Sequence, residues 1–328
     1  MISIIIPAYN AEKTLGSCLQ ALKAQTVQQP YEIIVVDDAS IDQTAAVAQQ
    51  HSAILLKLPQ NRGAAAARNL GLKHAQGDII CFTDADCLPR PNWLEQMIQP
   101  FDNPEIIGCK GIYETQQTEW VARFVQIEYE DKYDLLKKAQ FIDFIDTYSA
   151  AYRKSHLLKH DGFDERIFYV EDQELSFRLA AEAYKMVFQP AAIVGHVHSN
   201  TLSKYVRKKF MIGYWKSQII RRFPSRAIKD SHTPQTLKLQ ILLVALILIA
   251  LGLVVFSTRL WFLPAVGTLG FVLTTIPFIA KAWPKDKIIA LLSPILLFCR
   301  ALGLGFGTAR GFVQRLPHIE TIKSSLAS

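Results

Sequence analysis

Short apolar runs and helical patterns alternate along the first eighty residues of the chain. The runs, which are rich in β-branched side chains and almost uninterrupted, are 2–6 (ISIII), 32–36 (EIIVV), 53–58 (AILLKL) and 79–83 (IICFT). Such runs are typical of strands that are buried on both faces of a parallel sheet. Helical patterns separate them at 11–25, 42–50 and 63–75. The alternation predicts an α/β fold with a doubly wound, Rossmann-like and mostly parallel sheet.

The pattern loosens after Pro91. It predicts a helix near 91–99, a strand near 106–113, a long amphipathic helix near 117–139 and another helix that opens at Glu171. Ligands of doubly wound sheets bind at the carboxyl ends of the strands. The polar residues that follow the apolar runs are therefore the first candidates for a functional site.

Hydrophobic residues make up 50% of the chain, slightly more than in a typical soluble protein, and the excess is concentrated after residue 236. Stretches 239–256 and 260–280 contain no charged residue, and each is long enough to cross about 30 Å of hydrocarbon at about 1.5 Å per residue. A third stretch, 288–307, contains Pro294 and Arg300. Because a buried arginine is costly unless it is paired, we hypothesise that Arg300 meets a lipid phosphate.

The charges around these stretches bear on how the chain crosses a membrane. If the N-terminal part is cytoplasmic, Arg259 lies outside after the first span and the lysines after the second span return inside. A third full crossing would place Arg310 and Arg315 outside, whereas a re-entrant or interfacial segment keeps them inside. We therefore expect two firm spans plus an embedded or third helix.

The net charge of +7 comes from one segment, since residues 201–240 hold ten Lys and Arg against the single Asp230. A basic segment just before apolar spans favours an anionic bilayer surface over nucleic acid. Residues 204–223 are expected to form a basic amphipathic helix with Phe210, Tyr214 and Trp215 at the interface. Three regions are predicted: an α/β domain at 1–200, an interfacial segment at 201–236 and a membrane region at 237–328.

The five cysteines are odd in number and lack paired C-x-x-C spacing, so neither a disulfide framework nor a zinc site is indicated. A reducing compartment is expected. The chain enters an apolar run at once, without a charged leader or cleavage site, so no removable signal peptide is predicted.

Two aspartates with one spacer, Asp84-Ala85-Asp86, follow the run 79–83. Their carboxylates can present oxygens to a hard divalent cation, Mn²⁺ or Mg²⁺, that neutralises a diphosphate leaving group. The alternative interpretation is a plain turn, because aspartate is common in turns. Asp38 and the Glu171-Asp172 pair also have a functional and a purely structural interpretation. Asp38 could cap the helix at 42–50, and Glu171 and Asp172 lie in the first turn of a helix, where the macrodipole favours carboxylates.

Four segments together resemble family 2 glycosyltransferases of the GT-A fold, of the membrane-anchored bacterial type. They occur in the order SIIIPAYNAEKTL, VVDDAS, NRGAAAARNLGLKHAQGD with CFTDADC, and GFDERIFYVEDQELSFRLA. The resemblance covers roughly residues 1–200. It implies an inverting, metal-dependent hexosyltransferase that uses a nucleoside-diphosphate sugar, with UDP as the expected nucleotide.

The resemblance also implies roles for individual residues. Asp38 would accept a hydrogen bond from uracil, and Asp172, next to Glu171, would act as the catalytic base. Residues expected to bind the nucleotide-sugar are Pro7, Ala8, Tyr9, Asp38, Arg68, Asn69, Asp84 and Ala85. Those expected to hold the metal are Asp84, Asp86 and His196.

The acceptor is expected to be a hydroxyl of a membrane lipid or of a lipid-linked glycan, because an attacking hydroxyl needs a base whereas an ionised phosphate does not. A polyprenyl-phosphate glycosyltransferase is the alternative. Nucleotidyl transfer is disfavoured, because PAYNAEKT stands where a glycine-rich loop would be needed, and a non-catalytic scaffold is disfavoured by the retained carboxylates. The catalytic domain is expected at the cytoplasmic membrane, facing the cytoplasm.

Overall fold

The computed structural model describes residues 1–228 and 230–314, and these form two compact units. The first unit comprises Met1–Gln116 and Tyr133–Val197. The second comprises Gln117–Lys132 and the described residues from His198 onward. Helix α5 (Trp120–Leu136) therefore contributes its first part to the second unit and its last turn to the first.

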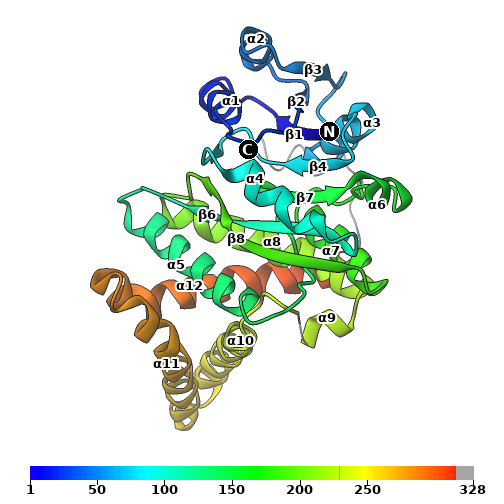
Figure 1. Cartoon of the computed structure of the whole chain (residues 1–328). Coiled ribbons are helices and arrows are strands. Elements are labelled where there is room, and N and C mark those ends of the chain that lie inside the picture. The colour runs from blue at the N-terminus through cyan, green and yellow to red at the C-terminus, as the bar shows by residue number, and fades with distance from the viewer. Residues whose placement is uncertain (229, 315–328) are drawn as a thin grey trace. The chain divides into compact units, whose positions relative to one another are not determined.

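The described residues of the first unit contain an eight-stranded sheet with the order β3-β2-β1-β4-β7-β6-β8-β5 (Figure 1). Its strands are β1 (Ile2–Ala8), β2 (Tyr31–Asp37), β3 (Ile54–Lys57), β4 (Ile79–Phe82), β5 (Leu88–Pro89), β6 (Ile106–Glu114), β7 (Ala150–Arg153) and β8 (Lys185–Gly195). Strands β1 to β4 pair in parallel, which confirms the predicted half of the sheet. Strand β7 joins β4 to β6 through antiparallel pairing on both sides, and β5, β7 and β8 were not predicted.

Helices flank this sheet, and all of them except α6 were predicted from the helical patterns. They are α1 (Leu15–Lys23), α2 (Thr44–Gln50), α3 (Ala64–His74), α4 (Trp93–Ile98), α6 (Lys154–Lys159) and α7 (Glu171–Ala181), with short 3-10 turns at Gln99–Asp102 and Thr147–Ser149. Small residues let α3 approach the sheet closely. A Cβ added at Gly71 would come within 2.5 Å of Cγ2 of Ile5, so α3 rests directly on β1.

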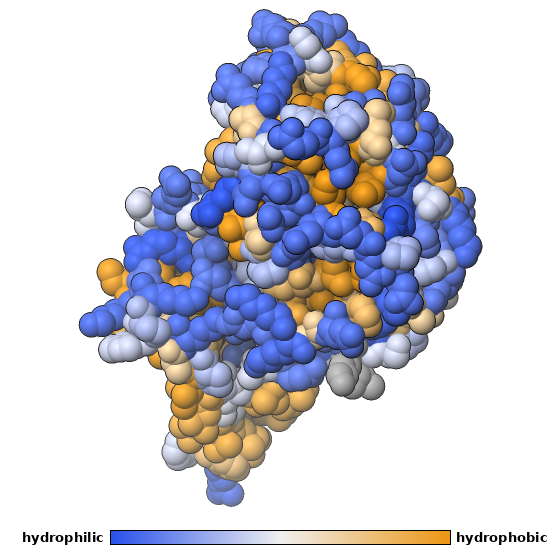
Figure 2. Space-filling view, in the orientation of Figure 1, coloured by the Kyte–Doolittle hydropathy of each residue, from blue (hydrophilic) through white to orange (hydrophobic). Residues whose placement is uncertain are grey.

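The second unit is helical. Besides α5 it contains α8 (Leu202–Arg222), α9 (Ser225–Ile228), α10 (Gln235–Phe256), the 3-10 turn Thr258–Leu260, α11 (Phe262–Ala282) and α12 (Lys287–Val313). Three of the described helices are long and apolar enough to cross a membrane: Gln235–Phe256, Thr258–Ala282 and Lys287–Val313. Figure 2 shows that the projection formed by α10 and α11 is almost wholly hydrophobic. The stretches 239–256 and 260–280, from which the sequence predicted two spans, lie within Gln235–Phe256 and Thr258–Ala282.

Two expectations for this unit were wrong. Tyr214 and Trp215 were expected at the bilayer interface, but they are 7% and 0% exposed because α12 packs along α8. Arg300 was expected to meet a lipid phosphate, but it is 5% exposed. Its guanidinium donates instead to Oε1 of Glu128 at 3.0 Å and to Oε1 of Gln240 at 2.6 Å.

Candidate functional site

A cavity of about 510 Å³ opens in the first unit, where β1, β2 and β4 end. It is lined by Pro7, Ala8, Tyr9, Asn10, Ala11, Thr14, Asp38, Ala64, Arg68, Asp84, Ala85 and Asp86. The volume falls within the range that is typical of small-molecule and cofactor sites. Eight of the lining residues were predicted from the sequence, and they come from four separate segments.

Asn10 belongs to the lining residues that sequence reasoning missed. Its amide oxygen accepts from the backbone N–H of Ile41 at 3.0 Å, and its own backbone N–H donates to Oγ of Ser40 at 2.9 Å. Asn10 has a left-handed backbone with φ of 50°, which asparagine adopts more readily than most residues. The available signal was an asparagine that follows the apolar run 2–6 after the three residues Pro-Ala-Tyr. It ties the loop after β1 to the loop after β2.

Asp38 is buried at the end of β2, with 3% of its surface exposed. Its two carboxylate oxygens accept from the backbone N–H groups of Arg62 and Gly63, each at 2.7 Å. Gly63 has φ of 88°, and a Cβ there would come within 2.9 Å of the Phe168 ring. Asp38 therefore fixes the loop before α3, and its contact with a uracil ring stays a prediction.

Arg68 connects two of the predicted motifs. From α3, its guanidinium donates to Oδ1 of Asp84 at 2.9 Å and to Oε1 of Glu171 at 2.5 Å. The side chain is 4% exposed, and among the described residues its Nε has no hydrogen-bond partner. Burial lowers the pKa of Arg68, but the carboxylates of Asp84, Glu171 and Asp172 raise it above its ordinary value, so the group stays charged. The exposed Arg62, in contrast, pairs with Glu165.

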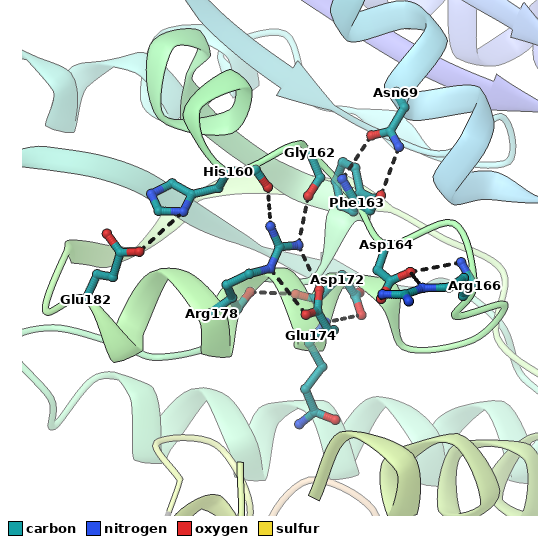
Figure 3. Close-up of polar contacts among 12 residues, drawn as sticks. Asn69, His160, Gly162, Phe163, Asp164, Arg166, Asp172, Glu174, Arg178 and Glu182 are labelled. Atoms are coloured by element: carbon teal, nitrogen blue, oxygen red, sulfur yellow. Dashed lines mark hydrogen bonds and ion pairs between the residues drawn. The ribbon is translucent and has the colours of Figure 1, made fainter. Parts of the chain in front are cut away.

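Asn69 is not among the residues that line the cavity. Its amide oxygen accepts from the backbone N–H of Phe163 at 2.9 Å, and its amide nitrogen donates to the carbonyl of Phe163 at 2.9 Å and to Oε1 of Glu165 at 3.0 Å (Figure 3). A two-way contact of this kind holds the GFDE segment against α3. Binding of a nucleotide-sugar by Asn69 stays a prediction, and the contacts of its amide are structural.

An arginine of α7 braces the same segment from the other side. Arg178 donates to the carbonyls of His160 and Gly162 and pairs with Glu174, which is 4% exposed (Figure 3). The GFDE segment is therefore held between α3 and α7. The two helices that carry Arg68 and Asp172 are joined through it.

Asp172 lies in the first turn of α7. Its Oδ1 accepts from the backbone N–H of Gln173 at 2.7 Å and its Oδ2 from that of Thr147 at 3.4 Å. Burial raises the pKa of Asp172 well above its ordinary value, and the negative charges of Glu171 and Asp146 raise it further, while Arg68 lowers it. A carboxylate with a raised pKa is a stronger base than an ordinary aspartate.

The backbone before this turn is strained. Val170 has a left-handed conformation with φ of 61°, which a β-branched side chain rarely adopts and which costs on the order of 1–3 kcal/mol. Such strain is retained where the surrounding contacts fix the segment, and it clusters at functional sites. Here it sets the direction in which Glu171 and Asp172 leave the loop.

The residues predicted to hold a metal do not all face one another. Asp86 is brought to within 3.6 Å of Nδ1 of His196, measured from its Oδ1, whereas Asp84 turns one oxygen to Arg68. The Cys87 thiol, which was not predicted, lies 3.9 Å from both partners. The backbone N–H of Cys87 also donates to the carbonyl of Asp84 at 3.0 Å, which closes a turn. The two aspartates therefore form a turn and also line the cavity.

This cluster fits a divalent cation. One ligand atom each from Asp86, Cys87 and His196 lies within 4.8 Å of the others, at the edge of the cavity that Asp84 and Asp86 line. A carboxylate oxygen and an imidazole nitrogen suit Mn²⁺, whereas Mg²⁺ favours oxygen ligands more strictly. The His196 ring stacks on Tyr113 at 4.3 Å, and Tyr113 stacks in turn on Tyr148, so the imidazole is held in place from behind.

Residues 3–160 match the family profile described as glycosyl transferase family 2. A pre-mycofactocin glycosyltransferase of Mycobacterium tuberculosis is 25% identical over 236 residues, which cover 69% of this chain and 48% of that protein. The UDP-Glc:alpha-D-GlcNAc-diphosphoundecaprenol beta-1,3-glucosyltransferase WfgD of Escherichia coli is 38% identical over 117 residues, 35% of this chain and 46% of that protein. The chain thus spans about half the length of these two relatives.

One solved structure with a similar fold is the mannosyltransferase PcManGT from Pyrobaculum calidifontis in complex with GDP-Man and Mn²⁺. It superposes with a TM-score of 0.61 at 18% identity, over 95% of this chain and 86% of that one. Identity at this level is evidence for the fold alone. Residues 3–160 are thus similar to glycosyl transferase family 2, and the chain has a mixed α/β fold of the GT-A type followed by long apolar helices.

Proposed function

We propose that the protein is an inverting, metal-dependent glycosyltransferase that moves a sugar from a nucleoside-diphosphate sugar, with UDP as the nucleotide, to a hydroxyl group. The observation that carries the proposal is the Arg68 bridge. It joins Asp84 at the cavity to Glu171 in the first turn of α7, directly before Asp172. A donor pocket and a candidate base are thereby held in one rigid network within the first unit.

The donor would occupy the cavity. Its volume of about 510 Å³ suits a nucleotide, and Asp38 with the loop after β1 would contact the base and the ribose. Tyr9, at 50% exposure, offers an open ring beside them. The diphosphate would then face Asp84 and Asp86 at the end of β4.

When bound at Asp86 and His196, Mn²⁺ or Mg²⁺ supplies positive charge that neutralises the departing diphosphate. The residues of the chain do the remaining work. Asp86 and His196 would hold the ion, and Arg68 keeps Asp84 in position at the cavity. The Tyr113 ring fixes the plane of the His196 imidazole.

The transfer would be a single displacement. Asp172 takes the proton of the acceptor hydroxyl, the hydroxyl oxygen forms a bond to the anomeric carbon, and the bond from that carbon to the diphosphate oxygen breaks. The electron pair leaves with the nucleoside diphosphate, and the anomeric configuration inverts. The raised pKa of Asp172 makes it a stronger base than an ordinary aspartate.

The acceptor that we propose is a membrane lipid or a lipid-linked glycan. Support comes from the three apolar helices, two of which match the predicted spans, and from the relative WfgD, whose name specifies a diphosphoundecaprenol-linked acceptor. A base such as Asp172 favours a hydroxyl over a polyprenyl phosphate, which is already ionised. We place the first unit on the cytoplasmic side of the cytoplasmic membrane, because nucleotide-sugars are cytoplasmic donors and residues 201–240 are basic.

The role of Asp172 can be tested with purified full-length protein. Asp172→Asn should lower kcat by about 10²- to 10⁴-fold with UDP affinity unchanged, because the base is lost and the cavity is not. Asp161→Asn is the matched control, since Asp161 is exposed and has φ of 56°, which asparagine accepts. Activity that survives in Asp172→Asn would refute the assignment, and a loss of UDP binding would assign the residue to the donor site.

The acceptor class needs a second assay. Radiolabelled UDP-sugars, membrane lipids and Mn²⁺ should give a product from which mild acid releases no labelled monosaccharide; a lipid-linked glycan would release its label as part of a larger oligosaccharide. Release of the label as a free monosaccharide would identify a sugar linked directly to phosphate and would replace our proposal with the polyprenyl-phosphate alternative.

A further inference from the structure

Helix α12 is long and apolar enough to cross a membrane, yet half of it is buried inside the protein. In α10 and α11 the corresponding shares are 22% and 17%. The difference prompts the question of what covers α12. Besides α10 and α11, which pack against it, two further helices of the second unit contact α12, and both are too polar for the interior of a bilayer.

The first of these is α5. Arg123 of α5 donates to Oδ2 of Asp286, the residue that caps α12, at 2.7 Å, and Glu128 of α5 accepts from Arg300 at 3.0 Å. Arg123 and Glu128 are about 7.5 Å apart along their helix, whereas Asp286 and Arg300 span about 21 Å. The start and the middle of α12 are therefore both fastened to one short, charged stretch of α5.

The end of α11 is fastened to the same stretch. Lys281 pairs with Asp131 at 3.2 Å, and Lys285 pairs with Glu130. The end of the second span, the turn after it and Arg300 thus all face carboxylates of α5. Charges that need these partners keep this region at the polar boundary of the membrane.

The second helix is α8, which runs alongside the last four turns of α12. Glycines at every fourth position, Gly303, Gly307 and Gly311, bring the backbones together, and a Cβ at Gly307 would overlap the carbonyl oxygen of Phe210. At Gly311 a Cβ would overlap the carbonyl of Tyr214, one turn further along both helices. The two helices are therefore parallel and in fixed register.

Helix α8 cannot enter hydrocarbon with this partner. It carries seven Lys and Arg in 21 residues, and Lys204, Arg207 and Lys208 are exposed. The part of α12 that is fixed to α8 must then stay at the same level. Only residues 287–299 remain, about 20 Å of helix that contains Pro294, and a crossing needs about 30 Å.

One face of α12 is nevertheless open and apolar. Ile288, Leu291, Ile295, Phe306, Phe312 and Val313 are between 45% and 85% exposed. Their spacing places them in a stripe along the helix. The opposite, buried side of α12 belongs to the same hydrophobic cluster as Ile247 of α10 and Phe271 of α11, so α12 is packed against the two apolar helices while the stripe stays open.

We infer that α12 does not cross the membrane. It lies along one surface, with this stripe in the acyl region of a single leaflet and the cations of α8 toward anionic headgroups. The membrane anchor is then the α10–α11 hairpin, and both ends of α12 are on the side of α8. This inference goes beyond the proposed sugar transfer and uses none of its residues.

Depth measurements test the inference directly. The background is the full-length protein with Cys299→Ser, which removes the one described cysteine that is not buried. Single cysteines placed at Leu291, Ile295 and Phe306 are labelled with bimane, and the protein is reconstituted in nanodiscs of phosphatidylcholine and phosphatidylglycerol. Cysteines at Leu242, Leu246 and Ile249 of α10 are the matched spanning series. Lipids brominated near the headgroup should quench all three α12 labels about equally, while quenching along α10 should change with depth.

Three outcomes would overturn the inference. If headgroup-brominated lipids quench the labels near the middle of α12 less than those toward its ends, α12 crosses the membrane. If the labels are protected from quenching and crosslinked dimers form, a second copy of the protein covers the stripe. If the lipids quench neither the α12 labels nor the α10 labels, the α10–α11 hairpin is not a membrane anchor. None of these measurements involves sugar transfer, so they remain separate from a failure of the proposed function.

Sidedness gives an independent readout. In sealed vesicles, a membrane-impermeant maleimide should label Lys204→Cys and Gln314→Cys from the same side and Thr258→Cys from the opposite side. Labelling of Gln314→Cys from the side of Thr258→Cys would show that α12 crosses.

Discussion

At the scale of single residues, two aspartates that look equivalent in the sequence differ in the fold. Asp84 turns to Arg68, while Asp86 turns to His196. The sequence identified both as candidate ligands, because Asp-x-Asp after a strand places them at a ligand-binding edge. It did not reveal that Asp84 pairs with Arg68, 16 positions away, or that the same arginine also reaches Glu171, 103 positions away.

Arg68 also controls the candidate base. Burial, Glu171 and Asp146 raise the pKa of Asp172, and the charge of Arg68 opposes them. Arg68→Gln should therefore raise that pKa further, so that activity is lost at a higher pH on the acidic side of the profile. The pH dependence of kcat/KM measures this shift. Arg62→Gln, which removes an exposed arginine of the preceding loop, should leave the acidic limb in place; equal shifts in both variants would contradict the account.

Tyr113 gives a second prediction at this scale. Its ring stacks on His196, so Tyr113→Leu should weaken Mn²⁺ binding by about 10-fold by releasing the imidazole. Isothermal titration with Mn²⁺ in the presence of UDP measures the change, and Tyr113→Phe, which keeps the stack, should restore the affinity. Equal affinities in the leucine variant and the wild type would exclude a positioning role.

At the scale of elements, the strands with continuous apolar runs were predicted and the later ones were not. Strand β7 is four residues long and begins with two alanines, so its sequence carries little strand preference. Its place between β4 and β6 is decided by tertiary pairing. Strand β8 contains Pro190 and is interrupted by a register shift against β6, which hides the alternation that would mark a strand.

The contribution of the α8–α12 packing to the free energy of unfolding can be measured with single glycine substitutions. Gly307→Ala should destabilise the second unit by about 1–3 kcal/mol, because the added methyl group meets the Phe210 carbonyl and the helices must separate. Gly252→Ala is the matched control: it lies in α10 with no atom within 4 Å of an added Cβ, so helix propensity should stabilise it by about 1 kcal/mol. Thermal unfolding in detergent compares the two, and a neutral Gly307→Ala would contradict the close packing.

At the scale of the whole molecule, the sequence indicated long apolar helices after residue 236, and the structure has them. The four motifs indicated family 2 glycosyltransferases, whose profile matches residues 3–160. The sequence did not reveal that the first part of α5 groups with residues beyond 197, because the helix continues without a break through that division. Nor did it show that Arg300 finds its partner in Glu128, 172 positions away.

The central claim is that the edge of the donor cavity, with Asp86 and His196, holds a divalent cation against a nucleoside diphosphate. A titration of Mn²⁺ followed by electron paramagnetic resonance in the presence of UDP tests it most directly. The account predicts one bound ion in the wild-type protein and in Asp78→Asn, a surface control, and binding at least about 10-fold weaker in Asp86→Asn. Binding of the same strength in all three proteins would contradict it.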